Sequence, residues 1–345
     1  MVADGKGNVE AGQGLVSIYD LGQLGGNRFA RMMRGSWNAL VAIRRIQPVI
    51  VHFHDPELIP LGILLKGIGY QVIYDVHEDV PRQILSKYYI PKMFRRPAAF
   101  VMALLEWFCA RIWTAIVPAT PNIAATPVIP ARFPPAKTVV VNNFPMLSEL
   151  ALPNSTPYDR RALSFAYIGG IETIRGAIEM VRALEFLNDI DDVSLELAGG
   201  FSPAGLGYAL RNLPGWDAVN YHGIVGRRQV AQILNCVRAG LVVLHPEPTH
   251  IDSYPIKMFE YMSTGIPVIA SDFPVWRRII DESGCGILVD PLNPENIAEA
   301  MRWIVNHPAE AESMGRRGRQ ATERTYNWDT EATKLLDLYD KVLAP

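Results

Sequence analysis

The stretch FAYIGGIETIRGAIEMVRAL, residues 165–184, passes from an apolar strand through two glycines into a helix. Gly169 and Gly170 would let a ligand approach the backbone closely, because neither carries a side chain. The start of the helix offers unpaired N–H groups and a positive potential, which suit a phosphate. Arg175 falls in or near the first turn, where a cation is mildly unfavourable unless an anion binds. The segment predicts a phosphate-binding turn, and the alternative is a plain strand–turn–helix with a surface arginine.

The same alternation of short apolar runs and helical patterns extends in both directions from this unit. Parallel strands need a crossover connection, usually a helix, so the alternation predicts βαβ units and parallel sheets. A stretch rich in Pro, Ser and Asn at 145–162 interrupts it and is typical of an interdomain linker. The expected strands are 48–54, 70–77, 112–120 and 137–144 before the linker, and 163–170, 193–200, 218–225, 239–246, 266–272 and 285–290 after it. We therefore predict an α/β fold of two doubly wound, Rossmann-like domains.

Length and charge agree with two domains that do different jobs. The chain has 345 residues, and a domain usually holds about 100–200. The first 150 residues carry 15 Lys and Arg against 10 Asp and Glu, whereas the remainder carries 18 against 25. The net charge of −2 gives no sign of nucleic-acid binding, but the basic half and the acidic half differ.

Cysteine usage and the first residues bear on the compartment. The three cysteines lie far apart and form no CxxC pair: Cys109, Cys236 and Cys285. This pattern argues against a disulfide framework and for a reducing compartment. The stretch at 1–14 has neither the basic nor the apolar region of a signal peptide. We expect a cytoplasmic protein.

A basic and aromatic segment at 82–108 leads into the longest apolar run, 97–119. Glu106 and Arg111 interrupt that run, so a buried or interfacial helix is expected rather than a membrane span. The segment carries five Lys and Arg with aromatic residues among them, which fits docking on an anionic membrane surface. The alternative is an amphipathic core helix preceded by a solvated loop. The predicted contact covers residues 82–111 and would place the protein peripherally on the inner face of the cytoplasmic membrane.

A second candidate helix N-terminus follows at IDSYPIKMFEYM, residues 251–262. A proline suits its first turn, and Asp252 or Ser253 would cap it. Lys257 brings a cation to the positive end of the helix dipole, as Arg175 does. Glu260, among bulky apolar neighbours, needs partners, which would be sugar or ribose hydroxyls or an internal arginine. The alternative is a capped amphipathic helix with one satisfied glutamate.

Two strands in the first half run directly into histidines. His77 follows the predicted strand in YDVHEDVPRQ, residues 74–83. His52 and His54 lie at the end of the predicted strand in VHFHDPELIP, residues 51–60. A histidine hydrogen-bonds a sugar or acts as an acid or base near neutral pH, and the alternative is a structural role in a loop. The HxHD pattern hints at a metal, but no third region offers clustered ligands. We therefore predict no metal site.

Taken together, these segments resemble glycosyltransferase family 4, the retaining enzymes of the GT-B fold. The family pattern in the second half is a Gly-rich strand end with a basic residue before a glycine, then LAGxG, E-x7-E with GxPVxASD, and GxLVxP. This chain offers YIGGIETIRG, LELAGG, DSYPIKMFEYMSTGIPVIASD and CGILVDPLNPENIAEAM. The first half, HFHDPELIP with VIYDVHEDVPRQI, looks like a subgroup from bacterial surface-polysaccharide clusters. The resemblance implies an acceptor-side domain at 1–150, a nucleotide-sugar-binding domain at 151–325, a cleft between them, and a last helix at 326–345 that crosses back.

The resemblance also implies roles in the second half. Glu260 matches the second Glu of E-x7-E and would bind the ribose hydroxyls. Asp252 matches the first Glu, one methylene shorter, and would lie near the donor sugar. Arg175 would hold the diphosphate, and Gly169 and Gly170 would let the phosphates approach.

Three further implications concern positions where this chain departs from the family or completes the site. His77 would face the donor sugar from the first domain. The family often has Arg where Gly170 stands, and Lys257 is expected to supply that phosphate charge from the other helix. Family members begin with a βα unit before the segment that matches VADGKGNVEAG, so this chain looks as though it begins inside the second strand, with the first unit absent.

The predicted function is transfer of a sugar, with retention, from a UDP- or GDP-linked donor to a hydroxyl of a glycan or lipid-linked glycan. Cations and helix N-termini would stabilise the departing diphosphate, so no metal and no other cofactor is expected. Two alternatives stay open, a GT-B nucleotide-sugar 2-epimerase and a truncated, non-catalytic nucleotide-binding module.

Overall fold

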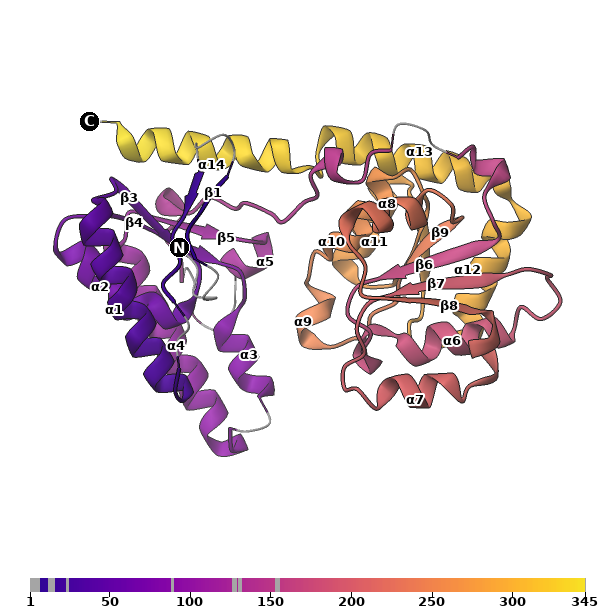
Figure 1. The fold of residues 1–345 in the computed structure, drawn as a ribbon, viewed down its shortest axis with the longest axis horizontal. Helices are drawn as coiled ribbons and strands as arrows, with labels where there is room; N and C mark the ends of the chain where they lie inside the picture. Colours follow the sequence, from indigo (N-terminus) through magenta and orange to yellow (C-terminus); the bar gives the residue numbers. More distant parts are fainter. Residues whose placement is uncertain are drawn as a thin grey trace. The chain divides into compact units, whose positions relative to one another are not determined.

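The computed structural model describes residues 7–11, 16–22, 25–87, 90–125, 129, 132–152 and 156–344. Contacts within the chain divide it into two compact units, drawn in Figure 1. The first unit comprises Met1–Val141 and Lys334–Pro345, and the second unit comprises Asn142–Thr333. Residues 2–6, in the segment expected to begin inside a strand, lie outside the description, as do Tyr88 and Tyr89 of the basic-aromatic segment.

The first unit is built on a three-stranded parallel sheet in the order β3-β4-β5. Its strands are β3 (Ile50–Phe53), β4 (Gln71–Val76) and β5 (Ala115–Pro118). Its helices are α1 (Arg28–Ile46), α2 (Ile59–Gly67), α3 (Val80–Ser86), α4 (Lys92–Ile112) and α5 (Pro121–Ala124). The aromatic rings of Phe53, Tyr74 and Trp113 pack on one another in its core, with centroids 5.0–5.5 Å apart. Three of the four strands expected here are confirmed.

The fourth expected strand, 137–144, is wrong in type. Residues Pro135–Lys137 form a 3-10 turn, and beyond it only Thr138 makes an isolated bridge, to Ile116. The segment still runs beside β5, because the N–H of Val141 donates to the carbonyl of Pro118 at 3.1 Å. Proline has no N–H to donate in return, so a regular ladder cannot form there.

The first strands of the chain also differ from expectation. β1 (Val9–Ala11) pairs antiparallel with β2 (Val16–Ile18) in a separate two-stranded sheet. They are not strands of the parallel sheet.

The second unit is a six-stranded, all-parallel sheet in the order β11-β10-β9-β6-β7-β8. Its strands are β6 (Ser164–Ile168), β7 (Ser194–Ala198), β8 (Val219–Gly223), β9 (Ala239–Val242), β10 (Val268–Ser271) and β11 (Gly286–Val289). All six expected strands of this half are confirmed. The order reverses between β6 and β9, and ligands of doubly wound sheets bind at the carboxyl ends of the strands at such a point.

Helices cover both faces of this sheet (Figure 1). One buried cluster includes side chains from α6 (Ala177–Glu185), α7 (Leu206–Arg211) and α12 (Pro294–Asn306). The other includes side chains from α8 (Arg227–Leu234), α10 (Ile256–Ser263) and α11 (Pro274–Ser283). The short α9 (Pro248–Ile251) precedes α10, and α13 (Pro308–Arg324) packs against α10. The two cores explain why the central strands read as continuous apolar runs.

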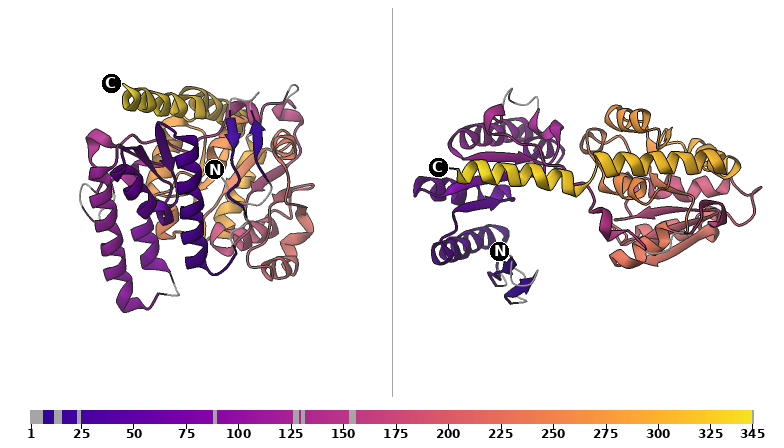
Figure 2. Two further views of the ribbon diagram at one scale, coloured as in Figure 1. Left: turned by 60° about the vertical axis from the view of Figure 1, so that its left-hand side comes forward. Right: turned by 90° about the horizontal axis from the view of Figure 1, so that it is seen from above.

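The last helix, α14 (Trp328–Leu343), is continuous, as Figure 2 shows. Its residues through Thr333 group with the second unit, and those from Lys334 group with the first. Among the residues described, no helix is both long enough and apolar enough to cross a bilayer.

Candidate functional site

Two glycine pairs leave bare backbone at the carboxyl ends of β6 and β7. Gly169 follows β6 with φ +133°, and its N–H donates to the carbonyl of Ala198 at 2.9 Å. Gly199 follows β7 with φ +149°, and a Cβ there would lie 1.8 Å from the carbonyl oxygen of Gly169. Only glycine therefore fits at Gly199, and the turn after β6 is fixed against the turn after β7. The end of β6 also borders the switch point of the sheet, which lies between β6 and β9.

Tyr261 ties helix α10 to the end of β6, next to the turn that contains Gly169 and Gly170. The hydroxyl of this buried side chain accepts a hydrogen bond from the N–H of Ile168, the last residue of β6, at 3.0 Å. Lys257 lies four residues earlier, so it is on the same face of α10. Its Nζ is 3.1 Å from the place where a Cβ of Gly169 would be. The helix therefore delivers a cation to the end of the neighbouring strand.

The ammonium of Lys257 is enclosed and has no hydrogen-bond partner among the described atoms. Its Nζ lies over the ring of Tyr167, 3.7 Å from the centroid. Burial, followed by the positive charge of Arg175, lowers the pKa of Lys257 to about 7. A buried donor without an acceptor is costly, and an anion above Gly169 would satisfy it.

Arg175 lies beside Gly170 and just before α6, near the first turn of the helix as expected. It ends a 3-10 turn, Thr173–Arg175, and Gly176 then caps α6 in the left-handed region at φ +77°. A Cβ on Gly176 would lie 2.1 Å from the carbonyl oxygen of Val243, the residue that follows β9. Only glycine therefore fits at this position, where the turn passes close to that backbone before the helix begins. The guanidinium comes within 3.6 Å of a Cβ position on Gly170. Gly169, Gly170, Lys257 and Arg175 are thus brought together.

Glu260 pairs with an arginine of the same chain, Arg227, which is one of the two kinds of partner left open by the sequence. It is 8% exposed, and its Oε1 lies 2.7 Å from Nη1 of Arg227. Arg227 also pairs with Glu149 at 2.8 Å. Sequence reasoning missed Arg227, although it is a cation in the first turn of α8 after a strand, the same signal that singled out Lys257.

Asp252 lies half-buried in the turn between α9 and α10. The expected cap at Asp252 or Ser253 is wrong, because the residue before the helix is Pro255 and no side chain caps it. Asp252 and Ser253 stand too far from the first turn, and Ser253 bonds elsewhere: its Oγ donates to the carbonyl of His250 and its carbonyl accepts from Trp276.

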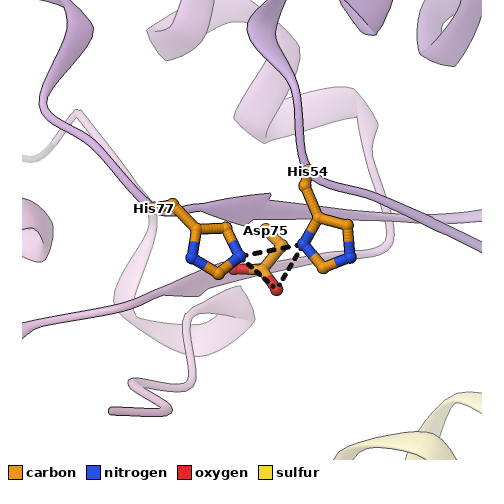
Figure 3. A group of neighbouring side chains, drawn as sticks. All are labelled: His54, Asp75 and His77. Atoms are coloured by element: carbon orange, nitrogen blue, oxygen red, sulfur yellow. Dashed lines mark hydrogen bonds and ion pairs between the residues drawn. The ribbon is translucent and has the colours of Figure 1, made fainter. Parts of the chain in front are cut away.

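His77 follows β4 directly and lies in the first unit, in a cluster around Asp75 (Figure 3). Oδ2 of Asp75 is 3.3 Å from Nε2 of His77 and 3.0 Å from Nδ1 of His54. Burial alone would raise the pKa of Asp75, but hydrogen bonds from His52, His54 and His77 outweigh it and hold that pKa well below its usual range. The hydrogen bond to Asp75 raises the pKa of His77. The two histidine motifs, separate in the sequence, thus converge on one carboxylate.

Comparison with known proteins identifies the second unit. Residues 153–321 match the family described as glycosyl transferases group 1. D-inositol 3-phosphate glycosyltransferase from Xylanimonas cellulosilytica is 29% identical over 190 residues. The match covers 53% of this chain and 43% of that protein, so the chain spans less than half of this relative's length.

Two solved structures share the fold. Sucrose-phosphate synthase from Thermosynechococcus elongatus superposes with a TM-score of 0.76 at 19% identity, covering 98% of this chain and 86% of that one. HepE from Anabaena, solved in complex with UDP, superposes with a TM-score of 0.68 at 12% identity, covering 88% and 81%. The chain therefore has the expected α/β fold of GT-B type with two parallel-sheet units, and residues 153–321 form a glycosyl transferases group 1 domain.

Proposed function

We propose that the protein transfers a sugar from a UDP- or GDP-linked donor to a hydroxyl of a glycan or lipid-linked glycan, as a family 4 enzyme with retention at the anomeric carbon. The enclosed, unpartnered ammonium of Lys257 beside Gly169 carries the proposal. It is a cation that lacks an anion at the switch point of a glycosyl transferases group 1 domain. A nucleoside diphosphate supplies that anion.

In this mechanism the diphosphate is the leaving group. Lys257 lies beside Gly169 and Arg175 beside Gly170, and both would stabilise the charge that develops on departure. Two cations placed in this way make a metal at the diphosphate unnecessary. Glu260, held by Arg227, would bind the ribose hydroxyls, and Asp252 would lie near the donor sugar. His77 of the first unit would contact the sugar.

The experiment is a calorimetric screen of UDP- and GDP-linked sugars against the purified chain. Lys257→Met should weaken binding of the preferred donor about 10- to 100-fold, because it removes a charge-assisted contact with phosphate. Arg182→Met is the matched control, since it removes an exposed cation from the last turn of α6, far from the strand ends, and should leave binding unchanged. Equal binding by the parent chain and Lys257→Met would overturn the site.

Turnover then separates the proposed activity from its alternatives. A transferase consumes the donor only when an acceptor is present, apart from slow hydrolysis. Conversion of the donor sugar with no acceptor would identify an epimerase instead. Tight binding without turnover of any donor would identify a non-catalytic nucleotide-binding module.

We also propose a cytoplasmic location on the inner face of the membrane, with a surface-polysaccharide intermediate as acceptor. Helix α4 supports this, since its side facing away from the core is apolar. The exposed apolar side chains of α4 recur at helical spacing: Met93, Phe100, Val101, Leu104, Leu105 and Phe108. Exposed cations, Lys92 and Arg96, lie near the start of the same helix. An apolar stripe with flanking cations suits an anionic lipid surface.

Vesicle co-sedimentation tests the membrane contact. The chain should bind vesicles that contain phosphatidylglycerol and bind phosphatidylcholine vesicles weakly. Phe100→Ser combined with Leu104→Ser should abolish binding, whereas Leu336→Ser, at an exposed apolar position of α14, should not. Equal sedimentation of all three proteins would refute docking through α4.

A further inference from the structure

We propose that the first unit binds a divalent transition-metal ion, Zn²⁺ in the first instance, through Nδ1 of His54, a carboxylate oxygen of Asp75 and Nε2 of His77. The ion is separate from the nucleotide diphosphate, for which the second unit supplies its own cations. The three side chains come from the end of β3 and the end of β4, two hydrogen-bonded parallel strands. Figure 3 shows the three side chains pointing toward one another.

The three ligand atoms have the spacing of one face of a coordination tetrahedron. Nδ1 of His54 lies 2.9 Å from Nε2 of His77, and Oδ2 of Asp75 lies 3.0 and 3.3 Å from these two nitrogens. Zinc–nitrogen bonds of about 2.0–2.1 Å imply ligand atoms about 3.3 Å apart. Small side-chain movements would therefore admit the ion without moving either strand.

Protons alone cannot satisfy this triangle. An imidazole nitrogen either carries a proton or offers a lone pair, and it never does both. If both nitrogens donate to Oδ2 of Asp75, two N–H groups oppose each other across 2.9 Å. If one nitrogen is bare, its lone pair opposes the lone pairs of the ionised carboxylate oxygen, whichever atom the other nitrogen donates to. With the carboxylate ionised, one edge of the triangle is therefore repulsive wherever the imidazole protons lie, whereas a cation at its centre attracts all three atoms.

A fourth side chain, His52, lies next to the carboxylate. His52 is 15% exposed, and its Nε2 lies 3.5 Å from Oδ2 of Asp75. Its Nδ1 is 2.7 Å from the hydroxyl of Tyr339, on the part of α14 that belongs to the same unit. Partners of this kind orient metal-binding side chains and raise the affinity for the ion.

The site is accessible to solvent. His54 is 59% exposed and His77 40%, whereas Asp75 is 13% exposed. His54 also lines a cavity of 880 Å³ between α1, β3 and α2. Three protein ligands with access to solvent leave the fourth position of a tetrahedral ion for water or another exchangeable ligand.

The sequence argued against a metal because no third region seemed to offer clustered ligands. That premise fails, since Asp75 and His77 meet His54 across the sheet. Ligation through Nε2 does not involve Nδ1 of His77, so the sugar contact proposed for His77 would fall to that other nitrogen. The metal proposal does not depend on the transferase activity.

The test uses the full chain without a histidine tag, stripped with a chelator and titrated with Zn²⁺ against a chromophoric competitor. We expect one tight site per chain and an upward shift of the thermal midpoint when Zn²⁺ is present. His54→Ala and Asp75→Asn should each weaken binding about 100-fold or more. His54 is largely exposed, so its variant should keep the unmetallated thermal midpoint of the parent.

His222→Ala is the matched control. His222 forms a pair with Glu196 at 2.6 Å, and the described residues place no third ligand of the metal-binding kind beside them. Zinc affinity should be unchanged in this variant. Absence of a 1:1 site in the parent chain, or equal affinity in His54→Ala and the parent, overturns the proposal.

Discussion

The ammonium of Lys257 lies against Gly169, next to the position that the Cβ of any other residue would take. The distance from Nζ to that Cβ position is 3.1 Å, and Gly169 has φ +133°. The bare backbone and the enclosed cation therefore depend on each other. An anion that approaches the end of β6 therefore meets the bare backbone and the cation at once.

Gly169→Ala should weaken donor binding by at least about tenfold. The new methyl group crowds Nζ of Lys257, and φ +133° is strained for alanine, so a stability loss of about 1–3 kcal/mol is also expected. Calorimetry with the preferred nucleotide sugar and chemical denaturation measure the two effects. Gly205→Ala is the control, because Gly205 has φ −65° and its Cβ would meet open space, and it should change neither.

Donor affinity should fall as the pH rises above about 7. The pKa of Lys257 is lowered to about 7 in the free protein, and a bound diphosphate favours the charged ammonium. Binding above that pH must therefore take up a proton, and affinity should drop up to about tenfold per pH unit. Calorimetry in two buffers of different ionisation enthalpy at pH 8 measures the proton. Lys257→Met should bind weakly without proton uptake, and a pH-independent affinity in the parent would contradict the prediction.

The same lowered pKa affects stability with the opposite sign. The unfolded chain holds the Lys257 proton up to its ordinary pKa of 10.5, whereas the folded chain loses it at about 7. The contribution of this group to the free energy of unfolding should therefore increase from about pH 7 to pH 10. The difference between parent and Lys257→Met, measured by urea denaturation across that range, isolates it.

Tyr261→Phe should lower both stability and donor affinity. It removes the hydroxyl that accepts the N–H of Ile168 at 3.0 Å, and an unpaired donor there costs about 1–3 kcal/mol. The lost hydrogen bond also loosens α10, the helix that contains Lys257, so calorimetry should show weaker donor binding. Tyr158→Phe is matched, since that buried hydroxyl donates to the backbone carbonyl of Arg238 at 2.8 Å, and it should lower stability alone.

Arg227→Met and Glu260→Gln should show coupled effects on stability. Their ion pair spans 2.7 Å, with Glu260 enclosed and Arg227 46% exposed, so solvent screening limits the coupling to about 1 kcal/mol. A double-mutant cycle in urea measures it. The pair of Arg319 and Glu323, both largely exposed, should couple by less than about 0.5 kcal/mol. Equal coupling for the two pairs would show that burial of Glu260 has no effect.

Much of the fold was predictable because the central strands of the second unit, β6, β9 and β10, are buried on both faces. Continuous apolar runs bounded by glycine then mark the strands, and all six were found. The segment at 137–144 looked the same, but Pro118 on the neighbouring strand cannot donate to it, and only spatial pairing reveals that. Arg175 was expected in or near the first turn of a helix and lies just before α6, but a sequence pattern does not show that Gly176 must pass the carbonyl of Val243 there.

The sequence by itself determined the alternation of strands and helices, the glycine turns and the cations that follow them, since these depend on local periodicity and on residues that lack or carry a side chain. Tertiary structure alone decided which groups meet. It placed Lys257 on Gly169, gave Glu260 the partner Arg227, and gathered His54 and His77 on Asp75. These contacts join residues on different strands and helices, and the pairing of elements in a sheet, not their order in the chain, sets such distances.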